Sequence, residues 1–205
     1  MNHTTTLKEN LRQEKYQAIL TDLYVDPNRI DYQTTRYIKA IECYETAFGA
    51  GGVSIYSAPG RSEIGGNHTD HQHGEVLAAS INNDAIAVVS PLDEPVVKVI
   101  SDSYELITID LGNLSLQESE KGSTRALIKG VLVSAQERGY RIGGFQTYIT
   151  SDVLIGAGLS SSAAFETIIG TILSGLYNEM KISPIEIAMM GQYAENVYFG
   201  KPCGL

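Results

Sequence analysis

The segment from Gly156 to Ala164 combines two glycines with three consecutive serines, and it lies between a predicted strand and a predicted helix. Glycines let backbone amides approach a ligand closely, and the first turn of a helix offers unpaired N–H groups and a positive dipole end. The serine hydroxyls can bond phosphate oxygens or ligate Mg²⁺. A serine-rich helix cap after a glycine turn is the structural alternative, but three serines followed by two alanines favour a phosphate-binding loop.

The spacing within this loop excludes the two common nucleotide-binding loops. A Rossmann loop has a third glycine where Ser161 stands, and a Walker A loop has a lysine that is absent here. We therefore expect a phosphate-binding loop of neither type.

A second polar segment, Gly60 to Gly74, is dense in short hydrogen-bonding side chains. Such a density suits a sugar, whose hydroxyls need both donors and acceptors. Arg61 adds a fixed positive charge that could serve a phosphoryl-transfer centre. Two other readings stay open, namely a polar surface loop and a transition-metal site formed by His68, His71 and His73 with Asp70.

Composition limits the partners of the 205-residue chain. Its net charge of −9 argues against binding of nucleic acid or anionic membrane through a basic face.

Cys43 and Cys203 form no CxxC pattern and are expected to be free thiols in a reducing cytoplasm. The polar first ten residues do not resemble a signal peptide, and no apolar run approaches the length of about 18 residues expected of a membrane span. A cytoplasmic location and small-molecule partners are therefore expected, and the sequence leaves protein partners open.

Hydrophobic periodicity predicts the elements that position the two polar segments. Residues 1–48 are expected to be helical, with Leu7, Leu11, Ile19, Leu20 and Leu23 at helical spacings and a second helix from about 34 to 48. A short strand over 53–57 leads to Ala58-Pro59-Gly60, and the segment 76–89 is rich in small and β-branched residues. Further strands are predicted at 96–100, 106–111 and 145–149, and helices at 123–138, 161–177 and 183–198. This order predicts an α+β domain.

Both polar segments resemble signatures of the galactokinases, within the superfamily of galactokinase, homoserine, mevalonate and phosphomevalonate kinases. Residues 60–74 resemble the pattern G-R-x-N-L-I-G-E-H-T-D-Y-N-x-G, and residues 156–164 are identical to its G-A-G-L-S-S-S-A-A loop. A third, weaker match lies at 126–131, and residues 194–205 resemble the beginning of the family motif A-E-x-x-F-x-G-x-x-C-G-x-M-D-Q. The resemblance implies an amino-terminal α+β kinase domain similar to domain 2 of ribosomal protein S5, with a mixed sheet backed by helices. Residues 51–205 would form this sugar- and ATP-binding domain, and residues 1–50 a helical extension packed on it.

The resemblance also implies ATP-dependent phosphorylation of a hexose, with galactose giving galactose 1-phosphate, and it implies a role for each matching residue. Arg61 is expected to stabilise the transition state, and Ser162 with Glu195 to hold Mg²⁺. The sugar ligands would be Glu63, Asn67, His68, Thr69, Asp70 and the backbone of Gly204. The ATP phosphates would be wrapped by Gly156, Ala157, Gly158, Leu159, Ser160, Ser161 and Ser162.

Three departures from the family pattern bear on the substrate. Glu63 replaces the family asparagine, Asn67 replaces its glutamate, and His71 replaces its tyrosine. The exchange keeps open a related kinase for another sugar or an amino sugar. A non-catalytic sugar sensor is a further alternative, which the intact Ser162-Ala163-Ala164 disfavours. The family's catalytic aspartate is expected two residues beyond Leu205, so these 205 residues alone are expected to be inactive.

Overall fold

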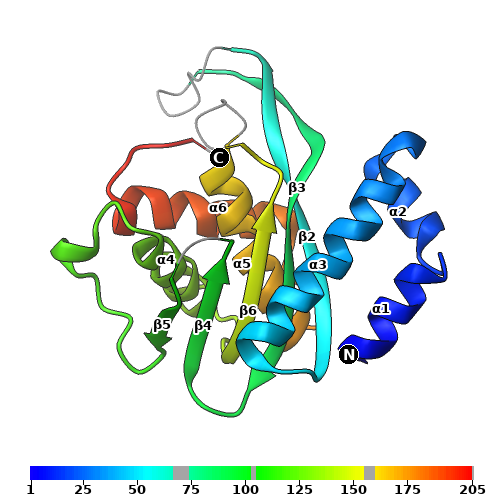
Figure 1. Ribbon diagram of the computed structural model, residues 1–205. Coiled ribbons are helices and arrows are strands. Elements are labelled where there is room, and N and C mark those ends of the chain that lie inside the picture. Colours follow the sequence, from blue (N-terminus) through cyan, green and yellow to red (C-terminus); the bar gives the residue numbers. More distant parts are fainter. Residues whose placement is uncertain (67–73, 103–104, 155–159, 205) are drawn as a thin grey trace.

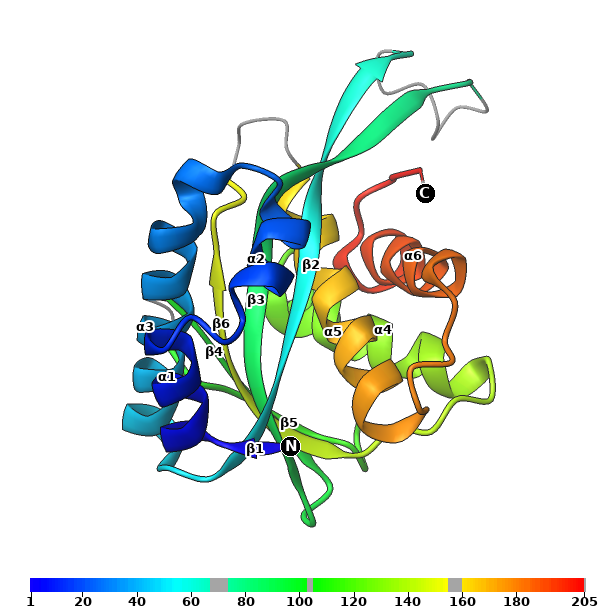
Figure 2. The same ribbon diagram turned by 90° about the vertical axis from the view of Figure 1, so that its right-hand side faces the viewer.

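The computed structural model describes residues 1–66, 74–102, 105–154 and 160–204. A six-stranded sheet with the strand order β1-β2-β3-β6-β4-β5 lies between two groups of helices (Figures 1 and 2). Strands β4 and β6 run parallel, and the other paired neighbours run antiparallel. The mixed sheet confirms the predicted α+β class. The strands are β1 (Asn2–His3), β2 (Gly52–Gly65), β3 (Leu77–Leu92), β4 (Val96–Ser101), β5 (Ile107–Asp110) and β6 (Gly144–Ser151).

The helices occupy both faces of the sheet, as Figure 2 shows with α1, α2 and α3 on one side and α4, α5 and α6 on the other. Within the described part of the chain, no helix is both long and apolar enough to span a membrane. The α-helices are α1 (Thr4–Arg12), α2 (Gln17–Tyr24), α3 (Ile30–Phe48), α4 (Thr124–Glu137), α5 (Ser161–Tyr177) and α6 (Pro184–Tyr193). Short 3₁₀ turns lie at Pro27–Arg29 and Glu118–Glu120, and a π-helical turn at Ala194–Phe199.

Strand β3 forms the centre of the molecule because its side chains are buried on both faces. Ala87 and Val89 point into the core shared with α4, α5 and α6, whereas Ile86 and Val88 point into the core shared with α1, α2 and α3. The alternation follows from the two-residue period of a strand. Two hydrophobic cores therefore lie back to back on one sheet.

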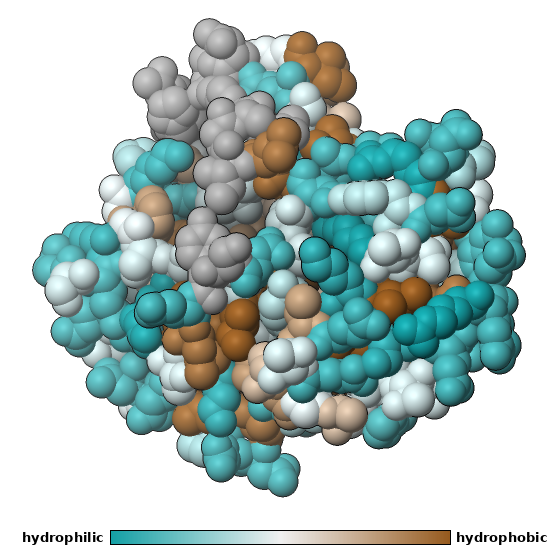
Figure 3. Space-filling view, in the orientation of Figure 1, coloured by the Kyte–Doolittle hydropathy of each residue, from teal (hydrophilic) through white to brown (hydrophobic). Residues whose placement is uncertain are grey.

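Helix α3 provides most of the cover on the face of α1–α3. Tyr37, Ile41 and Tyr44 are buried at helical spacing, and the helix packs on β3 and β6. The outer side of these helices is mainly hydrophilic (Figure 3). The helix begins at Ile30 rather than near 34, because the turn at Pro27–Arg29, capped by the Asp26 carboxylate, runs directly into it.

The earlier helical segment follows the predicted spacing only in part. Leu7, Leu11 and Leu20 are buried, but Ile19 and Leu23 are about half exposed. The short helix α2 buries only the face that carries Leu20 and Tyr24. The side chains of Ile19 and Leu23 lie on other faces of the helix and are therefore exposed to solvent.

A buried charge network joins α3 to the sheet. The Arg36 guanidinium donates to Asp84 Oδ1 at 2.6 Å and to the Asp84 carbonyl oxygen at 2.7 Å, and it lies 3.4 Å from Asp152 Oδ2. The hydroxyls of Tyr24 and Ser57 donate to Asp84 Oδ2 at 2.8 and 2.5 Å. The Asp84 carboxylate therefore has several donors that compensate for its burial.

Strand β2 is longer than predicted, since it continues through Pro59 and Gly60 to Gly65. The prediction of a short strand that ends at Ser57 was therefore wrong. Pro59 pairs with Asp84 and Arg61 with Ser80, so two more residues separate the partners on β3 than on β2. Proline is tolerated in strands at such bulges, where the regular ladder is already interrupted. The first part of the polar segment 60–74 is consequently a strand.

The final helix starts as predicted but changes character before it ends. Ser183 and Glu186 form a reciprocal capping box at its start, with Pro184 in the first turn. After Tyr193 the chain widens into the π-helical turn Ala194–Phe199, which ends at Gly200 with a φ of +86°. π-Helical turns are rare and are frequent at functional sites. The turn carries Glu195.

Candidate active site at the start of helix α5

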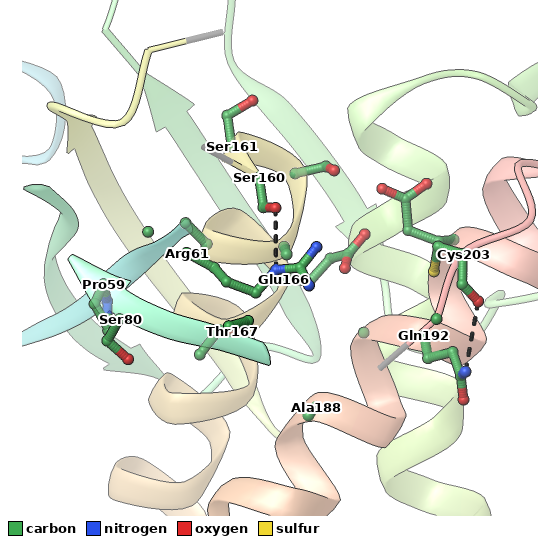
Figure 4. Close-up of a pocket in the computed structure, with 18 of the residues that line it drawn as sticks. Pro59, Arg61, Ser80, Ser160, Ser161, Glu166, Thr167, Ala188, Gln192 and Cys203 are labelled. Carbon is green, nitrogen blue, oxygen red and sulfur yellow. Dashed lines mark hydrogen bonds between the residues drawn. The ribbon is translucent and has the colours of Figure 1, made fainter. Parts of the chain in front are cut away.

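A pocket of about 740 Å³ lies where the outer part of the β2–β3 pair meets the first turns of α5 and the residues 201–204. Its wall also includes residues from α6 and Glu195 from the π-helical turn. Figure 4 shows side chains from β2, α5 and α6 around the same space. The site is therefore assembled from segments that are far apart in sequence, residues 59–80 and residues 160–204.

The first turn of α5 forms one wall of this pocket. Ser160 precedes the helix in the left-handed conformation, with φ of 54° and ψ of 54°, and Ser160, Ser161 and Ser162 all line the pocket. The N–H groups of a helix's first turn have no partner within the helix and attract anions. Three hydroxyls and a helix N-terminus thus face one cavity.

Arg61 reaches this helix start from strand β2. Its Nε donates to Ser160 Oγ at 3.3 Å, and Figure 4 shows the side chain extending toward the serines. The bulge between Pro59 and Arg61 interrupts the ladder just before the arginine, and bulges commonly re-aim a side chain beside a functional site. A fixed cation therefore lies beside the anion-attracting end of α5.

Two carboxylates lie deeper in the same pocket. Glu166 on α5 is 3% exposed and Glu195 is 5% exposed. Burial, and then the negative charge of Glu195, raise the pKa of Glu166 to about 9, whereas the charge of Lys201 acts in the opposite direction. At neutral pH the Glu166 carboxyl is therefore protonated unless a cation compensates its charge.

Two glycines make room for the Glu166 side chain and for the turn that carries Glu195. A Cβ on Gly191 of α6 would lie 2.9 Å from Glu166 Oε2, and a Cβ on Gly130 of α4 would lie 2.6 Å from the Cα of Ala194. The two glycines allow α5 and α6, and α4 and the π-helical turn, to approach closely. The segment 126–131, a weak match in the sequence, thus packs against the turn that carries Glu195.

The segment after the π-helical turn is held against α6. The Cys203 N–H donates to Asn196 Oδ1 at 2.7 Å, and the side-chain amides of Gln192 and Asn196 donate to the Cys203 carbonyl oxygen at 3.5 and 3.4 Å. These bonds place Gly204 at the edge of the pocket.

The predicted site residues fall into three groups. The pocket brings together Arg61, Ser160, Ser161, Ser162, Glu195 and Gly204. Glu63 lies on β2 opposite Ala78 and does not line the pocket formed by the described residues. Asn67, His68, Thr69 and Asp70, and likewise Gly156, Ala157, Gly158 and Leu159, lie outside the described residues.

The alternative transition-metal site falls on the same undescribed segment, since it requires His68, His71 and His73. Over residues 1–66, 74–102, 105–154 and 160–204, no group of three or more histidine, cysteine, aspartate or glutamate side chains could hold a metal ion.

Sequence reasoning missed Glu166, although a signal was present. The residue stands four positions after Ser162, and residues four apart lie on the same face of a helix. It is also the one acidic residue in α5, whose other buried positions include Ile168, Ile169 and Ile172. A single acidic residue on the buried face of a helix, one turn after the serines, indicates that its side chain lies near the ligand of the serine loop.

The fold is that of the amino-terminal domain of the GHMP kinases. Residues 126–205 match the GHMP kinases N terminal domain, and residues 42–91 match the galactokinase galactose-binding signature. A mevalonate kinase of Methanococcus jannaschii shares the fold with a TM-score of 0.62 at 20% identity, over 74% of this chain and 49% of that one. Both polar segments of the sequence thus lie within the matched ranges.

The similarity to galactokinases is closer. The galactokinase of Pyrococcus furiosus is 39% identical over 149 residues, which are 72% of this chain and 40% of that protein. The galactokinase of Streptomyces coelicolor is 32% identical over 164 residues, 80% of this chain and 42% of that protein. The structure of Lactococcus lactis galactokinase complexed with galactose has a TM-score of 0.72 and 28% identity, over 80% of this chain and 42% of that one.

The chain belongs to the galactokinase family and matches the amino-terminal part of its members, as the resemblance predicted. It spans about two fifths of the length of the curated relatives it matches, 40% and 42%.

Proposed function

We propose that the whole protein to which this chain belongs transfers the γ-phosphoryl group of ATP to a hexose, with galactose as the substrate and galactose 1-phosphate as the product. The observation that carries this proposal is the convergence of Arg61, the serines at the start of α5 and Glu195 on one pocket. The galactose-binding signature over residues 42–91 and the galactokinase relatives support the choice of sugar.

Phosphoryl transfer asks a protein mainly to position groups and to neutralise charge. The first-turn N–H groups of α5 and the hydroxyls of Ser160, Ser161 and Ser162 would hold the phosphates of ATP, together with residues 156–159. The sugar's hydroxyl would give its proton to the catalytic aspartate expected two residues beyond Leu205, and its oxygen would attack the γ-phosphorus. The bond from that phosphorus to the β–γ bridging oxygen would break, and ADP would leave with the electron pair of that bond. Arg61 would neutralise charge that develops on the transferred group.

The residues of the pocket fit a magnesium ion beside the phosphates. Glu195 is buried, its Oε2 has no hydrogen-bond partner among the described residues, and it shares the pocket with the Ser162 hydroxyl. Hard cations of this kind bind carboxylate and hydroxyl oxygens together with substrate phosphates. When bound, Mg²⁺ supplies positive charge that offsets the charge of the phosphates. We assign Ser162 and Glu195 to hold it.

The sugar-binding side of the proposal rests on sequence resemblance. Glu63, Asn67, His68, Thr69, Asp70 and the Gly204 backbone would contact the hexose. We likewise propose residues 51–205 as the kinase domain and residues 1–50 as an extension packed on it.

The test is an assay of the complete protein for ADP release with ATP, Mg²⁺ and a panel of galactose, glucose, mannose and galactosamine. We expect galactose to be preferred and phosphorus NMR to locate the product phosphate on the anomeric oxygen. Arg61→Ala should lower kcat by roughly 10²–10³-fold, as expected for loss of one transition-state contact. A complete protein that binds galactose and ATP but releases no ADP would instead be a sugar sensor, and preference for galactosamine would identify an amino-sugar kinase.

A further inference from the structure

Two buried carboxylates line the pocket, and the proposed metal site uses only one of them. Glu166 and Glu195 are both at least 95% buried. Glu166 Oε1 and Glu195 Oε2 have no hydrogen-bond partner among the described residues. Burying a carboxylate is costly unless a cation or hydrogen-bond donors compensate its charge. The pair therefore points to a ligand that is positively charged.

The position of Glu166 links it to the proposed phosphate site. It lies one helical turn after Ser162 on α5, so both side chains leave the helix on the same face. Both line the pocket that also contains Glu195. A cation held between Ser162 and Glu195 would therefore meet Glu166 as well.

The surrounding residues preserve this arrangement. Gly191 leaves space for the Glu166 carboxylate, because a Cβ there would lie 2.9 Å from Oε2. Lys201, an exposed residue, lines the same pocket as the two carboxylates. An exposed lysine can rearrange, so its charge compensates the buried pair only partly.

We propose that Glu166 is a second carboxylate of the cation site formed by Ser162 and Glu195, and that it contributes to binding the divalent cation of the nucleotide complex. The inference rests on the proposed function, since it assumes a divalent cation at this place. Magnesium sites of this kind use one or two carboxylates plus substrate phosphates, which is the arrangement that Glu166, Glu195 and ATP provide.

A purely structural role is the competing explanation. A protonated Glu166 could hydrogen-bond to Glu195 and so hold α5 against the π-helical turn. In that case Glu166→Gln would keep a donor at the same place and leave cation affinity unchanged. The two explanations therefore differ in metal binding rather than in folding.

The experiment measures Mn²⁺ affinity by electron paramagnetic resonance in the complete protein with a non-hydrolysable ATP analogue. Glu166→Gln should weaken Mn²⁺ binding by about 10–100-fold, the range typical of residues that support a metal site. In EDTA, which removes the metal ion, the affinity of Glu166→Gln for the analogue should be unchanged or higher, because the variant removes a negative group near the triphosphate. A folding defect would instead weaken analogue binding under both conditions.

Three further variants make the outcome decisive. Glu195→Gln should lose Mn²⁺ affinity at least as strongly, and Glu137→Gln, an exposed acid at the end of α4, should change nothing. Glu166→Asp retains the charge and should recover part of the loss, which keeps the test valid if Glu166→Gln folds poorly. Normal Mn²⁺ affinity in Glu166→Gln with a loss in Glu195→Gln would overturn this inference alone. Normal affinity in both would overturn the proposed metal site together with it.

Discussion

Gly130 of α4 packs directly on Ala194, so that a Cβ on the glycine would lie 2.6 Å from the alanine's Cα and 3.1 Å from the Tyr198 Cβ. The contact joins a helix with no residue in the pocket to the turn that carries Glu195. The position of a proposed metal ligand therefore depends on the absence of a side chain in another element.

Gly130→Ala tests this dependence. Alanine is the better helix former, but the backbone of Ala194 cannot yield as a flexible side chain could, so α4 and the turn must separate. We expect a net loss of about 1–3 kcal/mol in the free energy of unfolding, measured in urea, together with weaker metal-dependent nucleotide binding. Gly51→Ala is the matched control, because nothing lies within 4 Å of the added Cβ. Unchanged stability in Gly130→Ala would contradict the close packing.

Arg36→Met should be among the most destabilising single changes on the face of α1–α3. It leaves the buried Asp84 carboxylate without its guanidinium partner, although Tyr24 and Ser57 still donate to it. Removing one partner of a buried ion pair typically costs about 3–5 kcal/mol. Urea unfolding measures the loss, and Arg12→Met provides the comparison because its pair with Glu42 is more than half exposed on both sides. Equal effects of the two variants would show that burial of the Arg36 pair has no special weight.

The pair of Lys8 and Glu45 should make stability depend on pH in the acid range. Burial tends to raise the pKa of Glu45, but the hydrogen bond and charge of Lys8, 2.5 Å away, outweigh it and lower the pKa below its ordinary value of 4.5. A lowered folded-state pKa stabilises the protein at pH values above 4.5, and this contribution is lost as the pH falls through the lowered pKa.

Glu45→Gln should therefore be less stable than the parent at pH 7, by less than about 1 kcal/mol because the pair is partly exposed. The difference should shrink in thermal or urea unfolding as the pH falls below 4.5. Glu42→Gln, whose partner Arg12 is more than half exposed, should show little difference at either pH. A gap that widens toward acid pH would contradict the sign of this prediction.

The exchanged residues Glu63 and Asn67 predict a coupling in substrate recognition. If both contact one sugar, Glu63→Asn and Asn67→Glu should each lower kcat/KM for galactose in the complete protein. The double variant should then recover much of the loss, because a hydrogen bond to a charged group contributes about 1.5–3 kcal/mol and a neutral one about 0.5–1.5. Strictly additive losses would show that the two side chains do not act on one substrate.

Much of the fold could be predicted because local signals agreed with the tertiary structure. Helix α5 begins at Ser161 and ends at Tyr177, as its serine-rich start and apolar pattern indicate. The alternation of Phe145, Thr147 and Ile149 marks β6, and all three side chains are buried. The expected position of residues 160–162 at the start of a helix is likewise confirmed, whereas their binding of phosphate stays a prediction.

The rest depends on contacts that a local pattern does not contain. Pro59 and Gly60 predict the end of a strand, but the bulge opposite them in β3 lets the strand continue. The π-helical turn at Ala194–Phe199 follows a segment with an ordinary helical pattern, and it packs closely on Gly130, which is distant in sequence. The spacing of Glu166 from the serines can be read from the sequence, but its burial in the same pocket as Glu195 is a property of the tertiary structure. The division into residues 1–50 and 51–205, and the role of each site residue, stay predictions.

The outer part of the β2–β3 ribbon has a consequence for local unfolding. Beyond the bulge, β2 residues 61–65 pair with β3 residues 77–80, whereas β6 joins β3 only from Ala85 onward. A two-stranded ribbon has little stability of its own, so it can open at a lower free energy than the core requires. The amide hydrogens of this segment should exchange with solvent faster than those of residues 85–89. Each opening would separate Arg61 from Ser160, and a ligand that contacts both would slow this exchange without touching the centre of the sheet.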